Sequence, residues 1–506
     1  MKEDYKVNPE LLHHETGSGR KLLPVWVAFV PLVILVGLLV FVISAFGSDA
    51  LSGASQIALL TTSAFCVLIG LMLKTMHWSD FEQAVNENVS GVAQAILILL
   101  LIGAVGGSWM VSGIVPTMIY YGMQLIDPQW FLVSSCAICA FISVMTGSSW
   151  TTIATIGIAL MGIGKAQGFA EGWIAGAIIS GAYFGDKISP MSETTVLAAS
   201  TTRTPLFTHI RYMTYTTVPS FVITLTVFEI AGLMHQESSA QSMGEFTDGL
   251  QRVFVISPWL MLVPLVTALM IARKLPAVVI LFVATVLASM AAILVQTDLV
   301  DQIAADDLGV WMNRFKGVMI LVYGSTSLDT GVPALNELVA TRGMSGMMST
   351  VWLIFCAMIF GASMSAAGMI ESIMRMFIRL AHNTFSLVAS TVGVGLFMNI
   401  VCADQYLSLI LTGNMFRDTY KKLGFESRLL SRTTEDAVTV TSVLIPWNSC
   451  GMTQSMVLGV STLVYFPYCF FNYLSPVMTL IVAALGFRIF RTGSGDADKD
   501  NKTIGN

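Results

Sequence analysis

GAYFGDKISPMSETTVLAAS, residues 181–200, is the stretch that decides the fold. It places the carboxylates of Asp186 and Glu193 in a segment that is otherwise apolar or rich in Gly, Ser and Thr. A carboxylate at bilayer depth costs roughly 2.5–3.5 kcal/mol, so it needs an ion, a proton or a partner nearby. Pro190 removes a helix hydrogen bond and frees backbone carbonyls, and irregular backbone at this depth persists only where it is buried in protein or lines a cavity. The stretch therefore predicts a broken membrane helix that carries an ion site.

The composition indicates a polytopic membrane protein. Hydrophobic residues make up 55% of the chain, charged residues 11%, and the mean hydropathy is +0.75, far from the averages of soluble proteins. The net charge of −5 comes without a basic stripe and gives no indication of nucleic-acid binding. Cys136 and Cys139 have a CxxC spacing inside an apolar run, which favours buried inert thiols over redox or metal chemistry. Residues 1–23 contain no apolar core, so we expect no signal peptide.

Membrane spans follow from the length of the apolar segments, since a spanning helix needs about 20 mostly apolar residues. Four segments are apolar but interrupted, and they lie at residues 131–164, 170–200, 384–414 and 427–458. The first and third have polar midpoints, TGSSW at 146–150 and CADQY at 402–406, and each fits two short helices that meet at a tip. Clear single spans are predicted at 24–46, 55–73, 93–112, 212–234, 257–274, 276–296, 349–368 and 460–488.

The sequence repeats itself across a shift of about 256 residues. FISVMTGSSW at 141–150 aligns with FMNIVCADQY at 397–406, and KISP at 187–190 aligns with VLIP at 443–446. Each match is weak, and the offset that they share along nearly half the chain is the stronger signal. Internal repeats with interrupted helices near the midplane are typical of secondary transporters.

The positive-inside rule favours one topology. If 131–164 and 384–414 are re-entrant hairpins, ten spans remain and both termini are cytoplasmic. The short outer loops then hold only Lys165 and Arg252, whereas full crossing would place six further basic residues outside. With an odd number of crossings in each half, the two repeats are inverted. The predicted fold class is thus an all-α inverted-repeat secondary transporter with two re-entrant hairpins and two broken helices.

The predicted organisation divides the chain into two membrane repeats. The first spans residues 24–235 and the second 257–488, which includes a long connecting segment at 297–348. An external linker at 236–256 joins them, and the tails at 1–23 and 489–506 are expected in the cytoplasm.

Hydroxyls and carboxylates gather at the interruptions of the first repeat. Hard cations such as sodium prefer oxygen ligands, which free carbonyls, hydroxyls and a carboxylate supply. The alternative is that each Ser or Thr bonds back to a helix carbonyl. The predicted set in this repeat is Asp186, Ser148, Ser149, Thr151, Thr152, Ser189, Ser192, Glu193, Thr194 and Thr195.

In the second repeat the acid lies on the predicted hairpin at 384–414, whereas in the first repeat it lies on the broken helix at 170–200. Asp404 aligns with Ser148, and Ser442 aligns with Asp186, so each half keeps one of these two acids. Glu435 and Asp436 precede the break at Pro446, and one of them is equally consistent with a solvated position near Arg428 and Arg432 at the cytoplasmic mouth. Lys187 either pairs with Asp186 or extends to the surface. The predicted ion-binding residues here are Asp404, Asp436, Asn448 and Ser449, with sodium held through Asp186 and Asp404.

GSSWTTIATIGIALMGIG, GAYFGDKISPMSETTVLA and FTHIRYMTYTT resemble the NhaC-type sodium/proton antiporters of the ion-transporter superfamily. The resemblance covers about residues 24 to 490. It implies a carrier in which sodium and protons compete for buried carboxylates. Related members exchange dicarboxylates for monocarboxylates together with cations, so the resemblance leaves the substrate open.

The leading hypothesis is a sodium/proton antiporter of the inner membrane that is not an enzyme and needs no cofactor. Its predicted partners are sodium ions, protons and the lipid bilayer, with no nucleic acid, and a homodimer is an open alternative. The second hypothesis is an organic-acid exchanger of the malate/lactate type, against which the lack of an arginine in the expected site counts. An intramembrane hydrolase that uses Ser148 or Ser149 lacks a base at convincing spacing. A channel would show conductance in place of saturable counterflow.

Overall fold

The computed structural model describes residues 23–46, 53–234, 240–273, 275–306 and 309–492. Residues 1–22 and 493–506 of the expected tails and residues 236–239 of the expected linker lie outside the described residues. Within the described ranges every long element is a helix, and the extended pairs are two isolated bridges, Thr326–Thr341 and Phe425–Arg491. Eight helices are long and apolar enough to cross a membrane, or up to ten if two bent pairs each count as one span.

The helices of the N-terminal half follow the predicted segments closely. They are α1 (Val25–Phe46), α2 (Ala54–Met72), α3 (Trp78–Gly91), α4 (Ala93–Val111), α5 (Ile114–Leu125), α6 (Phe131–Thr146), α7 (Ser149–Thr152), η4 (Ile153–Gly157), α8 (Ile158–Ala166), α9 (Glu171–Ile188), α10 (Glu193–Thr201) and α11 (Leu206–Leu233). The connecting region contains α12 (Ala240–Val253), η5 (Pro258–Met261), α13 (Leu262–Ala272), α14 (Ala277–Val295), α15 (Thr297–Ala304), α16 (Val310–Tyr323), α17 (Pro333–Val339) and α18 (Gly343–Gly346).

The C-terminal half contains the second set. It comprises α19 (Met348–Ala366), α20 (Met369–Arg379), α21 (Thr384–Val401), α22 (Gln405–Lys422), α23 (Ser427–Thr434), η6 (Glu435–Thr439), η7 (Ser442–Leu444), α24 (Ser449–Leu458), α25 (Thr462–Tyr465), η8 (Phe466–Tyr468) and α26 (Phe470–Leu485). All four predicted interruptions are present, between α6 and α7, α9 and α10, α21 and α22, and η7 and α24. The expected single span at 460–488 is instead bent by 54° between residues 468 and 470. Pro467 explains the break, because proline cannot donate the backbone hydrogen bond that a continuous helix needs.

The repeat is visible in the local structure as well as in the sequence. Helices α7, α9 and α10 begin at positions 149, 171 and 193, and α22, α23 and α24 each begin 256 residues later. Gly147 before α7 and Ala403 before α22 both adopt left-handed backbone, with φ of 65° and 53°. The next residues, Ser148 and Asp404, then cap their helices by accepting a backbone N–H three positions on. The two tips therefore share the same backbone conformation and the same type of N-terminal helix cap.

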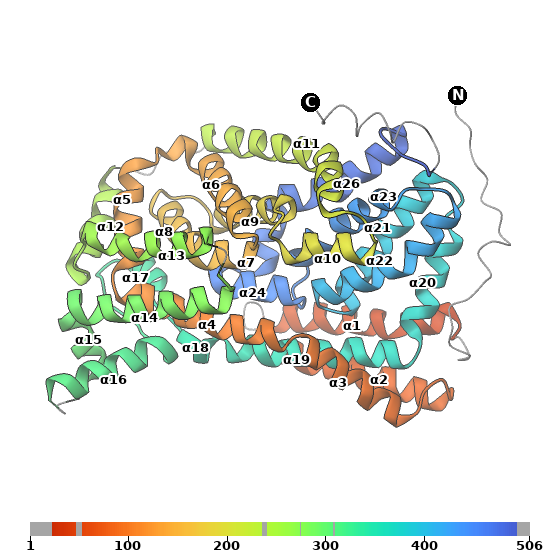
Figure 1. Ribbon diagram of the computed structural model, residues 1–506. Coiled ribbons are helices and arrows are strands. Elements are labelled where there is room, and N and C mark those ends of the chain that lie inside the picture. The colour runs from red at the N-terminus through yellow and green to blue at the C-terminus, as the bar shows by residue number, and fades with distance from the viewer. Residues whose placement is uncertain (1–22, 47–52, 235–239, 274, 307–308, 493–506) are drawn as a thin grey trace.

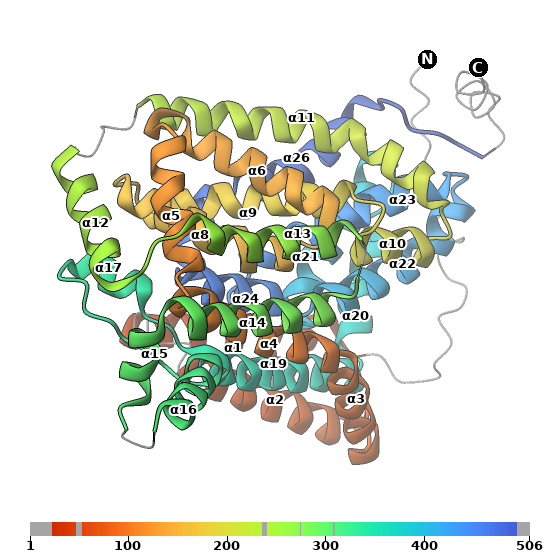
Figure 2. The same ribbon diagram turned by 60° about the vertical axis from the view of Figure 1, so that its left-hand side comes forward.

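The helices form an elongated bundle in which α9 packs against α6 and α11, and α4 packs against α14 and α19 (Figures 1 and 2). The short helices α5 and α20, which follow α4 and α19, lie at opposite ends of that bundle (Figures 1 and 2). Corresponding elements of the two repeats thus occupy opposite ends.

Small residues allow the closest helix contacts. A Cβ at Gly181 or Gly185 of α9 would collide with the carbonyl oxygens of Cys136 and Ala140 on α6. Small residues spaced four apart are a common way for membrane helices to approach closely. All seven cysteines are buried free thiols, as their apolar surroundings predict.

Candidate ion-binding site

A cavity of about 400 Å³ lies where the interrupted helices meet, and both Asp186 and Asp404 line it. Asp186 comes from the last turn of α9 and Asp404 from the residue before α22, so each repeat contributes one acid. Each residue is only 4% exposed. The polar residues that line this cavity are Gln94, Thr146, Ser148, Thr151, Asp186, Glu193, Thr194, Asp404, Gln405 and Tyr406.

The Asp186 carboxylate is held by the first residue of α7. Its Oδ2 accepts the hydroxyl of Ser149 at 2.7 Å and the backbone N–H of Ser149 at 3.2 Å. Unpaired N–H groups and a partial positive charge at a helix start stabilise a carboxylate. Asp186, a predicted sodium ligand, therefore contacts the predicted helix tip at residues 146–150.

The Asp404 carboxylate has the same kind of surroundings. One oxygen accepts the backbone N–H of Leu407 at 2.9 Å, and the other accepts the hydroxyl of Ser449 at 3.1 Å. Ser449 is the first residue of α24, as Ser149 is the first of α7. Both acids thus take a hydroxyl from a residue that starts a helix.

Neither acid has a basic partner in the part of the chain that the structure describes. Within the described residues no ion pair involves Asp186 or Asp404, and Lys, Arg and His are absent from the cavity lining. Lys187, expected to pair with Asp186 or to reach the surface, does neither. Its ammonium is fully buried, pairs with Asp436, and donates to the Ser475 hydroxyl at 2.6 Å.

Asp436 is accordingly an ion-pair partner in this structure, whereas the sequence placed it among the ion-binding residues. Its carboxylate also accepts the hydroxyl of Thr479. The alternative of a solvated position is wrong for both neighbouring acids, since Glu435 and Asp436 are fully buried. Neither carboxyl oxygen of Glu435 has a hydrogen-bond partner in the described residues. Both acids lie in the π-helical turn η6, residues 435–439, all of which are buried.

Several predicted hydroxyls bond the backbone. Ser189 donates to the carbonyl of Val144 at 2.8 Å, Thr195 to that of Lys187 at 2.9 Å, and Thr152 to that of Ser148 at 2.9 Å. These contacts match the alternative of back-bonding to carbonyls.

Other predicted residues organise the helix starts. Ser192 caps α10 and shares a hydrogen bond with Thr194 at 2.9 Å. Asn448 caps α24 and donates its amide to the carbonyl of Asn399 at 3.0 Å. Ser148 accepts both the N–H and the hydroxyl of Thr151, at 3.2 and 3.1 Å. Of the predicted set, Ser148, Thr151, Asp186, Glu193, Thr194 and Asp404 line the cavity.

The sequence reasoning did not identify Tyr406 as a site residue. Its hydroxyl donates to Glu193 at 3.1 Å and so joins α22 of one repeat to α10 of the other. Tyr406 aligns with Trp150 in the repeat, and both line the cavity. The repeat alignment itself was the signal that could have found it.

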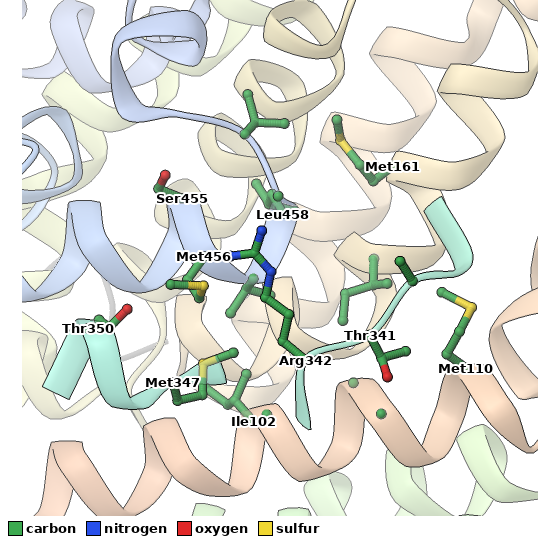
Figure 3. A pocket seen from close by; sticks show the side chains of 18 of the residues that line it. Ile102, Met110, Met161, Thr341, Arg342, Met347, Thr350, Ser455, Met456 and Leu458 are labelled. Carbon is green, nitrogen blue, oxygen red and sulfur yellow. The ribbon is translucent and has the colours of Figure 1, made fainter. Parts of the chain in front are cut away.

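A second cavity, of about 610 Å³, lies further along α24 (Figure 3). Met452, Ser455 and Met456 of α24 line it, together with Met161 of α8. Since α24 starts at Ser449, which bonds Asp404, the second cavity begins about one helical turn beyond the acids.

Comparison with known proteins shows which family the chain belongs to. The family described as the Na⁺/H⁺ antiporter family matches residues 181–487. The Na(+)/H(+) antiporter NhaC of Alkalihalophilus pseudofirmus is 35% identical over 427 residues, 84% of this chain and 89% of that protein. The malate-2H(+)/Na(+)-lactate antiporter of Bacillus subtilis is 32% identical over 440 residues, 86% of this chain and 90% of that protein. The Na(+)/H(+) antiporter NhaC of Bacillus subtilis is 32% identical over 412 residues, 80% and 87% of the two chains.

Proposed function

Because the chain belongs to the Na⁺/H⁺ antiporter family, we propose that it exchanges sodium ions for protons across a membrane, at the site that contains Asp186 and Asp404. The observation that carries the proposal is the pair of buried acids without a basic partner in the described residues, which line one cavity. Burial makes an ionised carboxylate unfavourable unless a cation or a proton neutralises it. Two such groups in one cavity are suited to bind sodium and protons alternately.

The proposed sodium ligands are the carboxylates of Asp186 and Asp404 with the hydroxyls of Ser149 and Ser449. These hydroxyls already contact the acids, at 2.7 and 3.1 Å. Their lone pairs face a cation once the hydroxyl hydrogens rotate away. A proton that leaves either carboxyl group frees it to bind sodium, and protonation on the other side of the membrane releases the ion. One site with two competing ligands gives exchange without leak, because each ligand excludes the other.

We propose an inverted relation between the repeats. Support comes from the opposite positions of α5 and α20, which follow corresponding helices (Figures 1 and 2). The shared offset of α7, α9 and α10 against α22, α23 and α24 supports the repeat itself. In the proposed topology, 131–164 and 384–414 form re-entrant hairpins, both termini lie in the cytoplasm, and the membrane is the inner membrane.

Access from both sides is consistent with the two cavities. The cavity at the acids reaches Leu275 and Pro276, next to the basic residue Arg273, which the positive-inside rule places in the cytoplasm. The second cavity is lined by Lys165, which the same topology places outside. Movement of α7 and α24 between them would expose the acids to one side at a time.

Exchange of an organic acid at this site is less well supported. A carboxylate substrate needs a cationic or hydrogen-bonding fork, and no basic residue of the described chain lines the cavity at the acids. The malate-2H(+)/Na(+)-lactate antiporter shows that a relative is named for such substrates. Comparison of sodium/proton exchange with and without malate or lactate distinguishes the two functions.

The direct test is transport by the purified protein in proteoliposomes. An imposed sodium gradient is expected to drive proton movement in the opposite direction, with saturation in sodium and no response to an equal potassium gradient. Proton movement that is insensitive to sodium would overturn the proposal.

A further inference from the structure

Glu435 is a fully buried acid that lines neither of the two cavities described above. Neither of its carboxyl oxygens has a hydrogen-bond partner in the described residues, and the exchange mechanism assigns it no role. We propose that Glu435 binds a second exchangeable proton, which a sodium ion in the cavity displaces without touching Glu435. This inference rests on the proposed sodium/proton exchange and adds a proton-binding residue to it.

The nearest basic group does not neutralise Glu435. Lys187 is the cation whose charge acts most on this carboxyl group. Its ammonium, however, pairs with Asp436 and donates to the Ser475 hydroxyl at 2.6 Å. Two carboxyl groups thus face one ammonium, which balances a single negative charge. Since a buried carboxylate without a counter-charge is strongly unfavourable, a proton on Glu435 balances the set.

Two further basic side chains near η6 engage other groups. The guanidinium carbon of Arg432, on α23, lies 4.4 Å from the centroid of the Tyr212 ring. The imidazole of His209, on α11, shares a hydrogen bond of 2.8 Å between its Nδ1 atom and the Ser431 hydroxyl. In the described part of the chain neither Arg432 nor His209 bonds Glu435.

The other helices that pack against η6 are α10, α21, α22 and α26. Helices α21 and α26 contain no charged residue. Helix α10 contributes Glu193, which accepts the hydroxyl of Tyr406, and the charged residues of α22 begin only at Arg417. A proton is therefore the ligand that fits Glu435, because the site is closed to the cavity in which sodium would lie.

Glu435 differs from the cavity acids in its hydrogen bonds. Asp186 and Asp404 each accept two, from a serine hydroxyl and a backbone N–H group. Such donors stabilise an ionised carboxylate, and Glu435 accepts none. Of the three acids, Glu435 is thus the one that keeps its proton after the cavity acids have ionised.

Sodium is linked to Glu435 through charge. Glu435 and Asp186 interact electrostatically. Once the cavity acids are ionised, a sodium ion bound to them adds a positive charge that favours loss of the proton from Glu435. By reciprocity, loss of that proton strengthens sodium binding. Glu435 then supplies the exchanged proton at alkaline pH, where the cavity acids have none to give.

The hydroxyl of Thr194 connects Glu435 with the cavity. It faces Glu435 and shares a hydrogen bond of 2.9 Å with Ser192, and Thr194 also lines the cavity at the acids. A hydroxyl can accept one hydrogen bond while it donates another. As the O–H bond of Glu435 breaks, Thr194 accepts that proton and gives its own to solvent in the cavity. Glu435 is left ionised and Thr194 is unchanged.

The test counts the protons released per sodium ion bound by the full-length protein in detergent, in weakly buffered solution with a pH-indicator dye. Release by the wild type is expected to continue into the alkaline range. In Glu435→Gln, alkaline release should fall to background, while release at lower pH persists because the cavity acids supply it. Glu435→Asp should restore part of the alkaline release, because it keeps an ionisable carboxyl group. Equal release by wild type and Glu435→Gln at every pH would overturn the inference.

Glu371→Gln is the matched control, since Glu371 pairs with Arg375 on α20, and it should release protons like the wild type. If Glu435→Gln does not fold, infrared difference spectra of the wild type with and without sodium decide. At alkaline pH, sodium is expected to remove the stretching band of a protonated carboxyl group, and an unchanged band would overturn the inference. Wild-type protein that binds no sodium, or binds it without proton release at any pH, would instead overturn the proposed function.

Discussion

The ammonium of Lys187 pairs with the carboxylate of Asp436 and leaves the adjacent acid, Asp186, without a basic partner in the described part of the chain. The pair joins α9 of the first repeat to η6 of the second. It neutralises a lysine next to the proposed sodium ligand. Sodium therefore does not have to displace Lys187 in order to reach Asp186.

Breaking this pair from one side should destabilise the protein. Removal of one partner of a buried pair leaves an uncompensated charge and costs about 3–5 kcal/mol. We expect Lys187→Met and Asp436→Leu each to lower the melting temperature, and the double variant to recover part of the loss. Thermal unfolding of the four proteins measures the coupling. Additive losses in the double variant would contradict a direct pair.

Neutralisation of either cavity acid should abolish exchange. Asp186→Asn and Asp404→Asn keep the shape of the side chain but can neither release a proton nor supply a full charge to sodium. Sodium-driven proton movement is expected to fall to background in both variants while membrane insertion is normal. Glu371→Gln is the control, because Glu371 pairs with Arg375 away from the cavity. Normal exchange by either Asn variant would remove that acid from the mechanism.

The two helix-starting serines should set sodium affinity more than turnover. Ser149→Ala and Ser449→Ala each remove one proposed ligand and one hydrogen bond, worth about 1.5–3 kcal/mol when the partner is charged. We expect the KM for sodium to rise by about tenfold or more with kcat less affected. Ser134→Ala is the control, since that hydroxyl bonds the carbonyls of Trp130 and Phe131 at the start of α6, away from the cavity. Unchanged KM in both variants would exclude the hydroxyls as ligands.

The tips of the two repeats offer a matched pair of backbone substitutions. Ala403 adopts φ of 53°, which costs a non-glycine residue about 1–2 kcal/mol. Ala403→Gly should therefore be tolerated or should raise the melting temperature. Gly147→Ala should lower it, because the added Cβ would lie 2.6 Å from the backbone of Met191. Equal thermal stability of the two variants would show that the tips do not share this geometry.

Much of the fold could be predicted because individual residues at the helix breaks cause those breaks locally. Pro190 and Pro446 cannot donate helix hydrogen bonds, and Gly147 takes the left-handed backbone that ends α6. Each break lies where these residues predict it. The repeat could be found because both tips need the same cap, Ser148 in one and Asp404 in the other.

Long-range partners could not be predicted in the same way. Nothing near Lys187 indicates that Asp436 will reach it, because the contact depends on how α9 packs against the second repeat. Glu435 is buried within a π-helical turn, and such a turn has no simple sequence signature. Arg342 lies in a connecting segment, and only the fold brings it beside Met456 of α24.

The most direct test of the central claim is the affinity of the purified wild-type protein for sodium as a function of pH. If sodium and a proton compete for the same carboxylates, each sodium bound displaces a proton. Affinity then rises by about tenfold per pH unit for one displaced proton, wherever the acids are protonated, and levels off above that range. A dissociation constant for sodium that does not change with pH would contradict the account.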